Sequence, residues 1–185
     1  MLKAINLAPI LLALAVVPAL AQGVGSYAGE QAGAAKALSA EEIRDLLEGR
    51  GMGLAKAAEL NRHPGPMHVL DLAEPLGLSE TDAAAVRRVF EAMRAEARAL
   101  GREIVAAEGE LDRLFAQGAA DQAMVDALTA KIGALQGRLR AVHLNAHLAI
   151  RPLLASDTVA RYDNLRGYVD EPTRGHAPGA NPHRH

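Results

Sequence analysis

Two apolar stripes dominate the pattern of hydrophobic and polar positions along this chain, one on each side of a short turn. The first stripe contains Val86, Phe90, Met93, Ala97, Leu100, Ile104, Ala107, Leu111 and Leu114. The second contains Val125, Leu128, Ile132, Leu135, Leu139, Val142, Ala146, Ala149 and Leu153. Spacing of three and four residues keeps one face of a helix apolar. Because only residues 117–120 separate the stripes, we expect two long helices packed antiparallel.

Shorter helices are predicted on both sides of this hairpin. The expected helices cover residues 39–48, 54–61, 67–76, 79–114, 121–154 and 157–169. Ser39 and Glu42 have the spacing of a capping box, Ser79 and Ser156 are expected to cap later helices, and Gly77 is expected to end one. No stretch alternates like a β-strand, so the predicted fold is all-α: a long antiparallel helical hairpin with short flanking helices and a disordered C-terminal tail.

The first 21 residues have the pattern of an export signal. Lys3 precedes the apolar run of residues 7–17, and Ala19-Leu20-Ala21 is a small-x-small cleavage site. The run is short for a membrane span. We therefore predict cleavage before Gln22, release into a periplasm and no membrane span in the mature protein. The chain has no cysteine, which excludes disulfides and thiolate metal sites.

The predicted organisation has four parts. Residues 1–21 are the signal peptide, 22–65 an N-terminal extension with two short helices, and 66–170 the helical-hairpin domain. Residues 171–185 form a polar tail that contains His176, His183 and His185. These tail histidines are either a loose metal-recruiting segment or an incidental low-complexity end.

Composition excludes several classes of function. The formal net charge is −2 and only 3% of the residues are aromatic, which argues against a nucleic-acid-binding surface. No segment resembles a nucleophile elbow or a complete phosphate-binding loop, so we expect a protein that is not an enzyme. A core of small aliphatic residues buries little area, which makes a homodimer plausible.

A His-x-x-x-His pair is the strongest candidate for chemistry. His143 and His147 project from one face of a helix and can chelate one divalent metal. We expect them to flank the apolar seam, open to water, with Glu96 near His143 and Glu91 near His147. His68, on the helix before the hairpin, completes the candidate metal ligands. The alternative is a pair of surface histidines hydrogen-bonded to glutamates.

Methionine adds a weaker signal. Met67 precedes His68 and is a candidate thioether ligand, whereas Met93 and Met124 are expected to fill the core. No cofactor is expected to be obligatory, and the candidate metals are zinc, nickel and copper.

The chain resembles the LTxxQ-motif family of periplasmic helical-hairpin proteins, which comprises Spy- and CpxP-like chaperones and related heavy-metal sensor and zinc-resistance proteins. The degenerate motif copies are Leu78-Ser79-Glu80-Thr81-Asp82 and Leu154-Ala155-Ser156-Asp157-Thr158. In the sensor branch, a His pair before the hairpin, a Glu on its first helix and a His-x-x-x-Met/His on its second form the metal site. Here His68, Glu91 and His143/His147 match these elements, while Leu72 stands where the second early His would be.

The resemblance implies one of two functions, and a third stays open beside them. The first is an ATP-independent chaperone or modulator of envelope stress, with unfolded clients or a stress-signalling protein as its partner. The second is a periplasmic heavy-metal sensor or resistance protein that uses His143 and His147. The third is a purely structural helical dimer.

Overall fold

The computed structural model describes Tyr27, Gly33 and residues 35–168, and every regular element in these ranges is helical. The elements are α1 (Ala40–Glu48), α2 (Lys56–Glu59), α3 (Pro66–Asp71), α4 (Ala73–Leu76), α5 (Glu80–Ala116), α6 (Gln122–Ile150), the 3₁₀ turn η1 (Arg151–Leu153) and α7 (Ser156–Arg166). The all-α prediction is confirmed. The predicted signal peptide and the tail from residue 171 lie outside the described residues.

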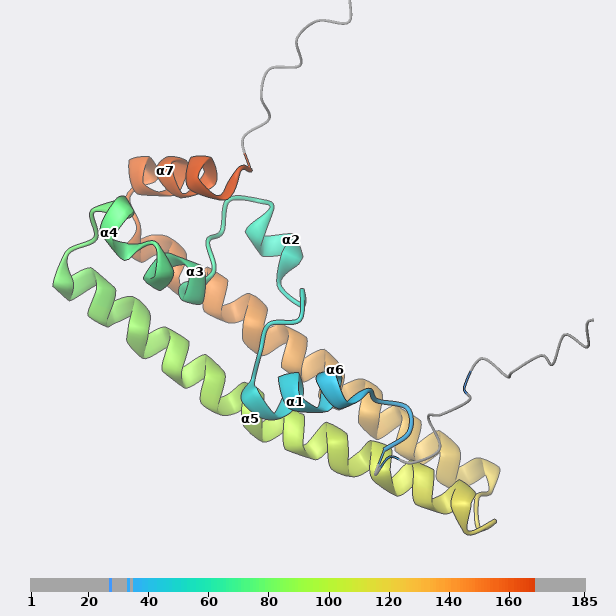
Figure 1. Cartoon of the computed structure of the whole chain (residues 1–185). Helices are drawn as coiled ribbons and strands as arrows, with labels where there is room; N and C mark the ends of the chain where they lie inside the picture. The colour runs from blue at the N-terminus through green and yellow to red at the C-terminus, as the bar shows by residue number, and fades with distance from the viewer. Residues whose placement is uncertain (1–26, 28–32, 34, 169–185) are drawn as a thin grey trace, which may run out of the picture. The chain divides into compact units, whose positions relative to one another are not determined.

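The chain divides into two compact units, Met1–Gln31 and Ala32–His185, and the description here concerns the second. Within it, α5 and α6 lie side by side over their length, as the green and orange ribbons of Figure 1 show. None of the helices in the described part combines the length and the apolar character that crossing a membrane requires.

The hairpin forms because both helix starts are capped and the turn between them is tight. The Ser79 hydroxyl accepts the Asp82 amide at 3.1 Å, and Asp121 Oδ1 accepts the Met124 amide at 2.8 Å. Each cap satisfies an amide that has no partner within its helix. Gly118 has a φ of 64° in the connecting turn, a conformation that glycine adopts without strain.

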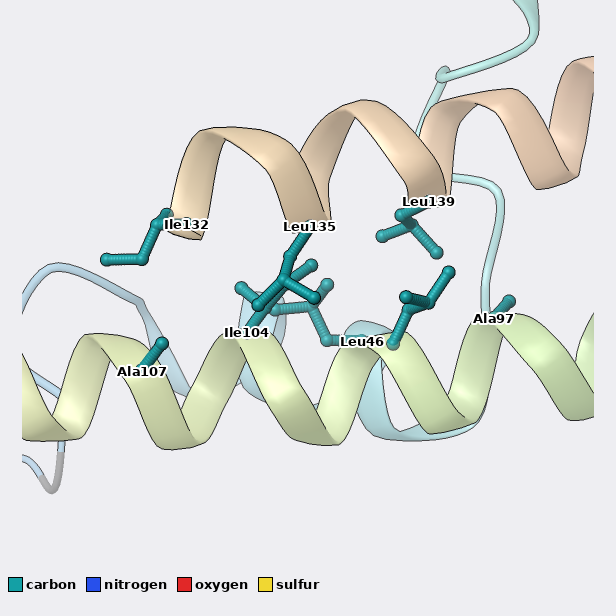
Figure 2. Packing of buried hydrophobic residues seen from close by; sticks show 8 residues of the cluster. Leu46, Ala97, Ile104, Ala107, Ile132, Leu135 and Leu139 are labelled. Atoms are coloured by element: carbon teal, nitrogen blue, oxygen red, sulfur yellow. The ribbon is translucent and has the colours of Figure 1, made fainter. Parts of the chain in front are cut away.

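The middle of the hairpin holds the first hydrophobic cluster. Ile132, Leu135 and Leu139 of α6 face the α5 residues, and Leu46 of α1 fills the space beside them (Figure 2). The α5 members are Ala97, Leu100, Ile104 and Ala107. Burying each leucine or isoleucine contributes roughly 1.5–3 kcal/mol. The predicted stripes are confirmed in this region.

Helix α1 packs directly against the backbone of α5. The capping box at its start is confirmed, since Ser39 Oγ accepts the Glu42 amide at 3.1 Å and Glu42 accepts the Ser39 amide at 2.8 Å. At Gly101 an added Cβ would lie 2.1 Å from the Leu46 carbonyl oxygen. Only glycine at this position lets α1 approach so closely.

A second hydrophobic cluster lies where α5 begins and α6 ends. Its buried members are Val69, Leu76, Val86, Ile150, Leu154, Val159 and Tyr162. They come from α3, α4, α5, α6, α7 and the segment after η1. Helices α3, α4 and α7 therefore close this end of the hairpin (Figure 1).

Two predicted helix boundaries were wrong because of prolines. The second long helix ends at Ile150 instead of residue 154, since Pro152 has no amide to continue it and lies in η1. The predicted helix 67–76 is split into α3 and α4 at Leu72, because Pro75 cannot bond back to the carbonyl four residues earlier. Gly77 ends α4 in the left-handed conformation, as expected.

Two smaller predictions were also wrong. Ser156 is the first residue of α7 and does not cap it, since the capping position is Ala155, which makes no side-chain hydrogen bond. The helix expected over 54–61 is restricted to α2, between turns in which Gly53 and Arg62 have positive φ.

Candidate functional site

His143 and His147 lie on the part of α6 where the buried face of the helix departs from the predicted apolar stripe. Both are buried, with exposed fractions of 5% and 8%, so the prediction that they are open to water was wrong. The buried face continues through His147 and Ile150, whereas Ala149 and Leu153, expected in the seam, are exposed. A 3.5-residue repeat drifts on a straight helix of 3.6 residues per turn. The helices that close this end of the hairpin, α3, α4 and α7, cover the face of α6 that is buried here.

The carboxylate beside the imidazoles is Glu59, at the end of α2. Its Oε2 lies 3.6 Å from His147 Nδ1, and its Oε1 accepts a hydrogen bond from His68 Nδ1 at 3.2 Å. Glu91 and Glu96, the carboxylates expected here, are exposed on α5 and do not line the cavity described below. His68, the third candidate histidine, does lie in this group.

Glu59 is held by donors from the C-terminal helix as well. The Tyr162 hydroxyl donates to Oε1 in a short hydrogen bond, and the Tyr168 hydroxyl donates to the same atom at 3.1 Å. The Arg166 guanidinium lies 3.7 Å away. Burial raises the pKa of Glu59, but the hydrogen bonds from His68, Tyr162 and Tyr168 outweigh it and lower the pKa to about 2. The carboxylate is therefore ionised and accepts only.

His147 is fixed in one tautomer. Its Nδ1 lies 2.7 Å from the His63 carbonyl oxygen, which can only accept, so Nδ1 carries the proton and Nε2 is left with its lone pair. Gly65 makes room for this ring, since a Cβ there would lie 3.0 Å from His147 Cε1 and 3.1 Å from Glu59 Oε2. His68 likewise donates from Nδ1, to the ionised Glu59.

His143 has an unsatisfied ring nitrogen. Its Nε2 is buried and has no hydrogen-bond partner, as is also true of Glu59 Oε2. Burial lowers the pKa of His143, and the neighbouring His147 lowers it further, so both effects favour the neutral ring. A buried polar atom without a partner costs roughly 1–3 kcal/mol. This orphan nitrogen is the feature of the site that most requires an explanation.

These groups line one cavity of about 620 Å³, which we call the histidine cavity. Its lining includes Glu59, His68, His143 and His147 together with other charged residues, which are Asp45, Glu48, Arg50, Lys56 and Arg94. Much of the remaining wall is apolar and includes Met52, Met67, Phe90 and Met93. The expectation that Met93 serves only as core filler is therefore incomplete, because it also faces the cavity.

Neutral imidazoles with free nitrogens can ligate a metal, and the hydrogen bonds around them resemble those of metal-bound histidines, which donate their other N–H to a carboxylate or carbonyl. As the side chains stand, however, no three His, Asp or Glu residues in the described ranges are grouped to hold a metal ion. Three side chains donate to Glu59 Oε1, through which it orients the His68 ring, whereas its Oε2 has no hydrogen-bond partner.

Sequence reasoning missed Glu59, Tyr162 and Tyr168. A local signal existed for Glu59, since it precedes His63 and His68 by four and nine residues around the Pro64-Gly65-Pro66 turn. A turn of this kind brings the flanking residues together. The two tyrosines had no such signal, because more than 100 residues separate each from Glu59. The tail histidines lie outside the described residues.

Comparison with known proteins gives one match. No curated protein and no solved structure matches the chain. Residues 4–161 match the sequence profile of a family described as heavy-metal resistance, and this range covers most of the 185 residues. It includes α1 to α6 and every residue that lines the histidine cavity. The chain therefore belongs to the heavy-metal resistance family.

Proposed function

We propose that this protein binds a transition-metal cation in the histidine cavity, with His143 and His147 as ligands. The observation that carries the proposal is the buried, unpartnered Nε2 of His143, one helical turn from the free Nε2 of His147. A metal ion would satisfy both lone pairs at once. The heavy-metal resistance family supplies independent support.

The remaining residues of the site would orient the ligands. The His63 carbonyl fixes the His147 tautomer, and Glu59 fixes that of His68. Outer partners of this kind hold the ring in position and make it more basic as a ligand. When bound, the cation would supply positive charge next to the ionised Glu59. The protein is proposed to be non-enzymatic, since it would sequester or sense the metal.

The position of the site suggests how binding would be transmitted. His143 and His147 belong to α6, whereas His68 and Gly65 belong to the segment at α3, which packs on α5 and α6. A metal that favours the closed arrangement of these elements shifts the population towards it. The export pattern of residues 1–21 supports a periplasmic location for this proposed role.

Zinc titration of the purified protein tests the proposal. We expect saturating zinc to raise the melting temperature, because a ligand at a hundred times its Kd adds about 2.7 kcal/mol of stability. The variant His143→Ala/His147→Ala should lose the increase. His63→Ala is the matched control, since the His63 side chain does not line the cavity and its carbonyl is retained. Equal behaviour of wild type and double variant, with zinc and with Cu(I) alike, would refute the proposal.

The chaperone role, the homodimer and the purely structural role stay predictions. A light-scattering assay with an unfolded client separates the first from the others. Suppression of aggregation at substoichiometric protein, unchanged in His143→Ala/His147→Ala, would show that holding clients is independent of the histidine cavity. Unchanged scattering at several-fold excess of protein would count against the chaperone role.

A further inference from the structure

Three of the five methionines in the chain line the histidine cavity. Met52 lies in the loop after α1, Met67 near the start of α3 and Met93 on α5. The other two are the first residue and Met124, which lies close to the hairpin turn. The fold thus brings thioethers from three separate segments to the cavity that His143 and His147 also line.

Two of these methionines are poorly placed for a purely packing role. Met52 and Met67 are 40% and 48% exposed, which leaves much of each side chain in water. Met52 also has a φ of 43°, between Gly51 and Gly53. A left-handed backbone is uncommon for a residue with a side chain, and glycine would adopt it at lower cost. Such conformations concentrate at functional sites.

The donor set of the cavity favours a soft metal. No group of three imidazoles or carboxylates is preformed among the described residues. Three side chains donate to Glu59 Oε1, and its unpartnered Oε2 lies 3.6 Å from His147 Nδ1, the ring nitrogen that donates to the His63 carbonyl. Asp45 and Glu48 are paired with Arg50. Besides Glu59 Oε2, the donors that the cavity offers a metal are the imidazole nitrogens and the thioethers. Zinc prefers nitrogen, oxygen and thiolate ligands, and the chain has no cysteine. Thioether sulfur selects soft ions such as Cu(I).

We propose that the histidine cavity is selective for a soft monovalent cation, Cu(I) or its oxidation-resistant analogue Ag(I), which Met93, Met67 and Met52 bind together with His143 and His147. This inference rests on the proposed function and names the metal class for the same site. Acidic and basic side chains are equally numerous around the cavity, which suits a singly charged ion. Their charges belong to Asp45, Glu48 and Glu59 and to Arg50, Lys56 and Arg94.

Competition with a chromophoric Cu(I) chelator under reducing conditions tests the inference. We expect the wild type to withdraw Cu(I) from the chelator and the triple variant Met52→Leu/Met67→Leu/Met93→Leu to bind it at least tenfold more weakly. Leucine nearly conserves the volume of methionine, so folding should be retained. Met124→Leu is the matched control and should bind as the wild type does. Because Met93 is half-buried, the double variant Met52→Leu/Met67→Leu keeps the test open if the triple variant unfolds.

Nuclear magnetic resonance of ¹³C-labelled methionine methyl groups provides a second readout. Ag(I) should shift the resonances of Met52, Met67 and Met93 and leave that of Met124 in place. Unchanged Met52, Met67 and Met93 resonances at saturating Ag(I) would overturn thioether binding.

The outcomes separate this inference from the proposed function. If the triple variant binds Cu(I) as tightly as the wild type, thioether selectivity is wrong and the histidine site stands. If zinc binds through His143 and His147 while Cu(I) does not bind, the inference fails alone. If neither metal discriminates wild type from His143→Ala/His147→Ala, the proposed function fails and the inference fails with it.

Discussion

At the scale of single residues, Glu59 connects more of the structure than any other side chain of the site. One carboxylate accepts hydrogen bonds from His68 on α3 and from Tyr162 and Tyr168 at the C-terminal end, and it lies beside His147 of α6. A buried carboxylate is costly unless it is paired. The segment of Glu59 itself, α3, α6 and the C-terminal end of the described chain therefore all have to stay in place to stabilise this buried charge.

The low pKa of Glu59 predicts acid sensitivity. Its folded pKa of about 2 lies below the unfolded value of about 4.3, so its contribution is complete above about pH 5 and is lost as pH falls towards 2. Urea unfolding between pH 6 and pH 2.5 should show the wild type losing on the order of 2–3 kcal/mol more than Glu59→Gln. Parallel pH profiles for the two proteins would contradict the prediction.

At the scale of elements, glycine positions determine how closely helices pack. The Leu46 carbonyl of α1 occupies the place that a Cβ on Gly101 would take, whereas Gly133 of α6 has open space around it. Both glycines lie inside long helices, so they form a matched pair that differs only in its neighbours.

Alanine substitutions at these two positions should have opposite effects. Gly133→Ala should stabilise the protein by about 0.5–1 kcal/mol, because alanine loses less backbone entropy in a helix. Gly101→Ala should destabilise it by roughly 1–3 kcal/mol, since α1 has to move away from α5. Urea denaturation measures both. Equal shifts of the midpoint in the same direction would show that α1 does not pack on α5 as described.

The hairpin could be predicted from the sequence because its determinants are local and periodic. Repeats of three and four residues, capping serines and a short turn each act within a few positions. Pro75 and Pro152 carry equally local information, since a proline limits the helix that precedes it. The burial of His147 could not be read in this way, because it depends on segments far away in the chain that cover this end of α6.

The carboxylate of the site could not be assigned for a similar reason. Folding the hairpin about its turn predicts which residues of α5 and α6 lie opposite each other along the hairpin axis, and this pairs Glu91 and Glu96 with the histidines. A position along the axis does not determine whether a side chain faces the cavity. Glu59 reaches the histidines from a different segment, through a turn at Pro64-Gly65-Pro66. Such contacts follow from the packing of α2 and α3, which no periodicity in the sequence indicates.

At the scale of the whole described unit, two hydrophobic clusters are separated by a polar layer. The first cluster occupies the middle of the hairpin, and the second joins α7 to the end of α6. His143 and His147 lie between them along α6. Proteins open in cooperative parts of unequal stability, and such parts tend to follow structural units.

Removing the Tyr162 hydroxyl should therefore lower the local stability of the end of the hairpin that α3 and α7 close. Tyr162→Phe deletes the hydrogen bond to the ionised Glu59, and bonds to charged groups contribute about 1.5–3 kcal/mol. Native-state hydrogen exchange should become faster in α7 and α3, with little change for α5 and α6 amides around Leu100 and Leu135. Uniform acceleration throughout the hairpin would show that the clusters unfold together.

The contact of Tyr162 and Tyr168 with Glu59 has a practical consequence. The chain contains three tyrosines and no tryptophan, so these two phenols supply most of its near-ultraviolet absorption. Both donate to the same anion, and phenol spectra respond to the strength of that bond. The protein thus carries a built-in optical reporter, and any event that disturbs this carboxylate can be followed without attaching a dye.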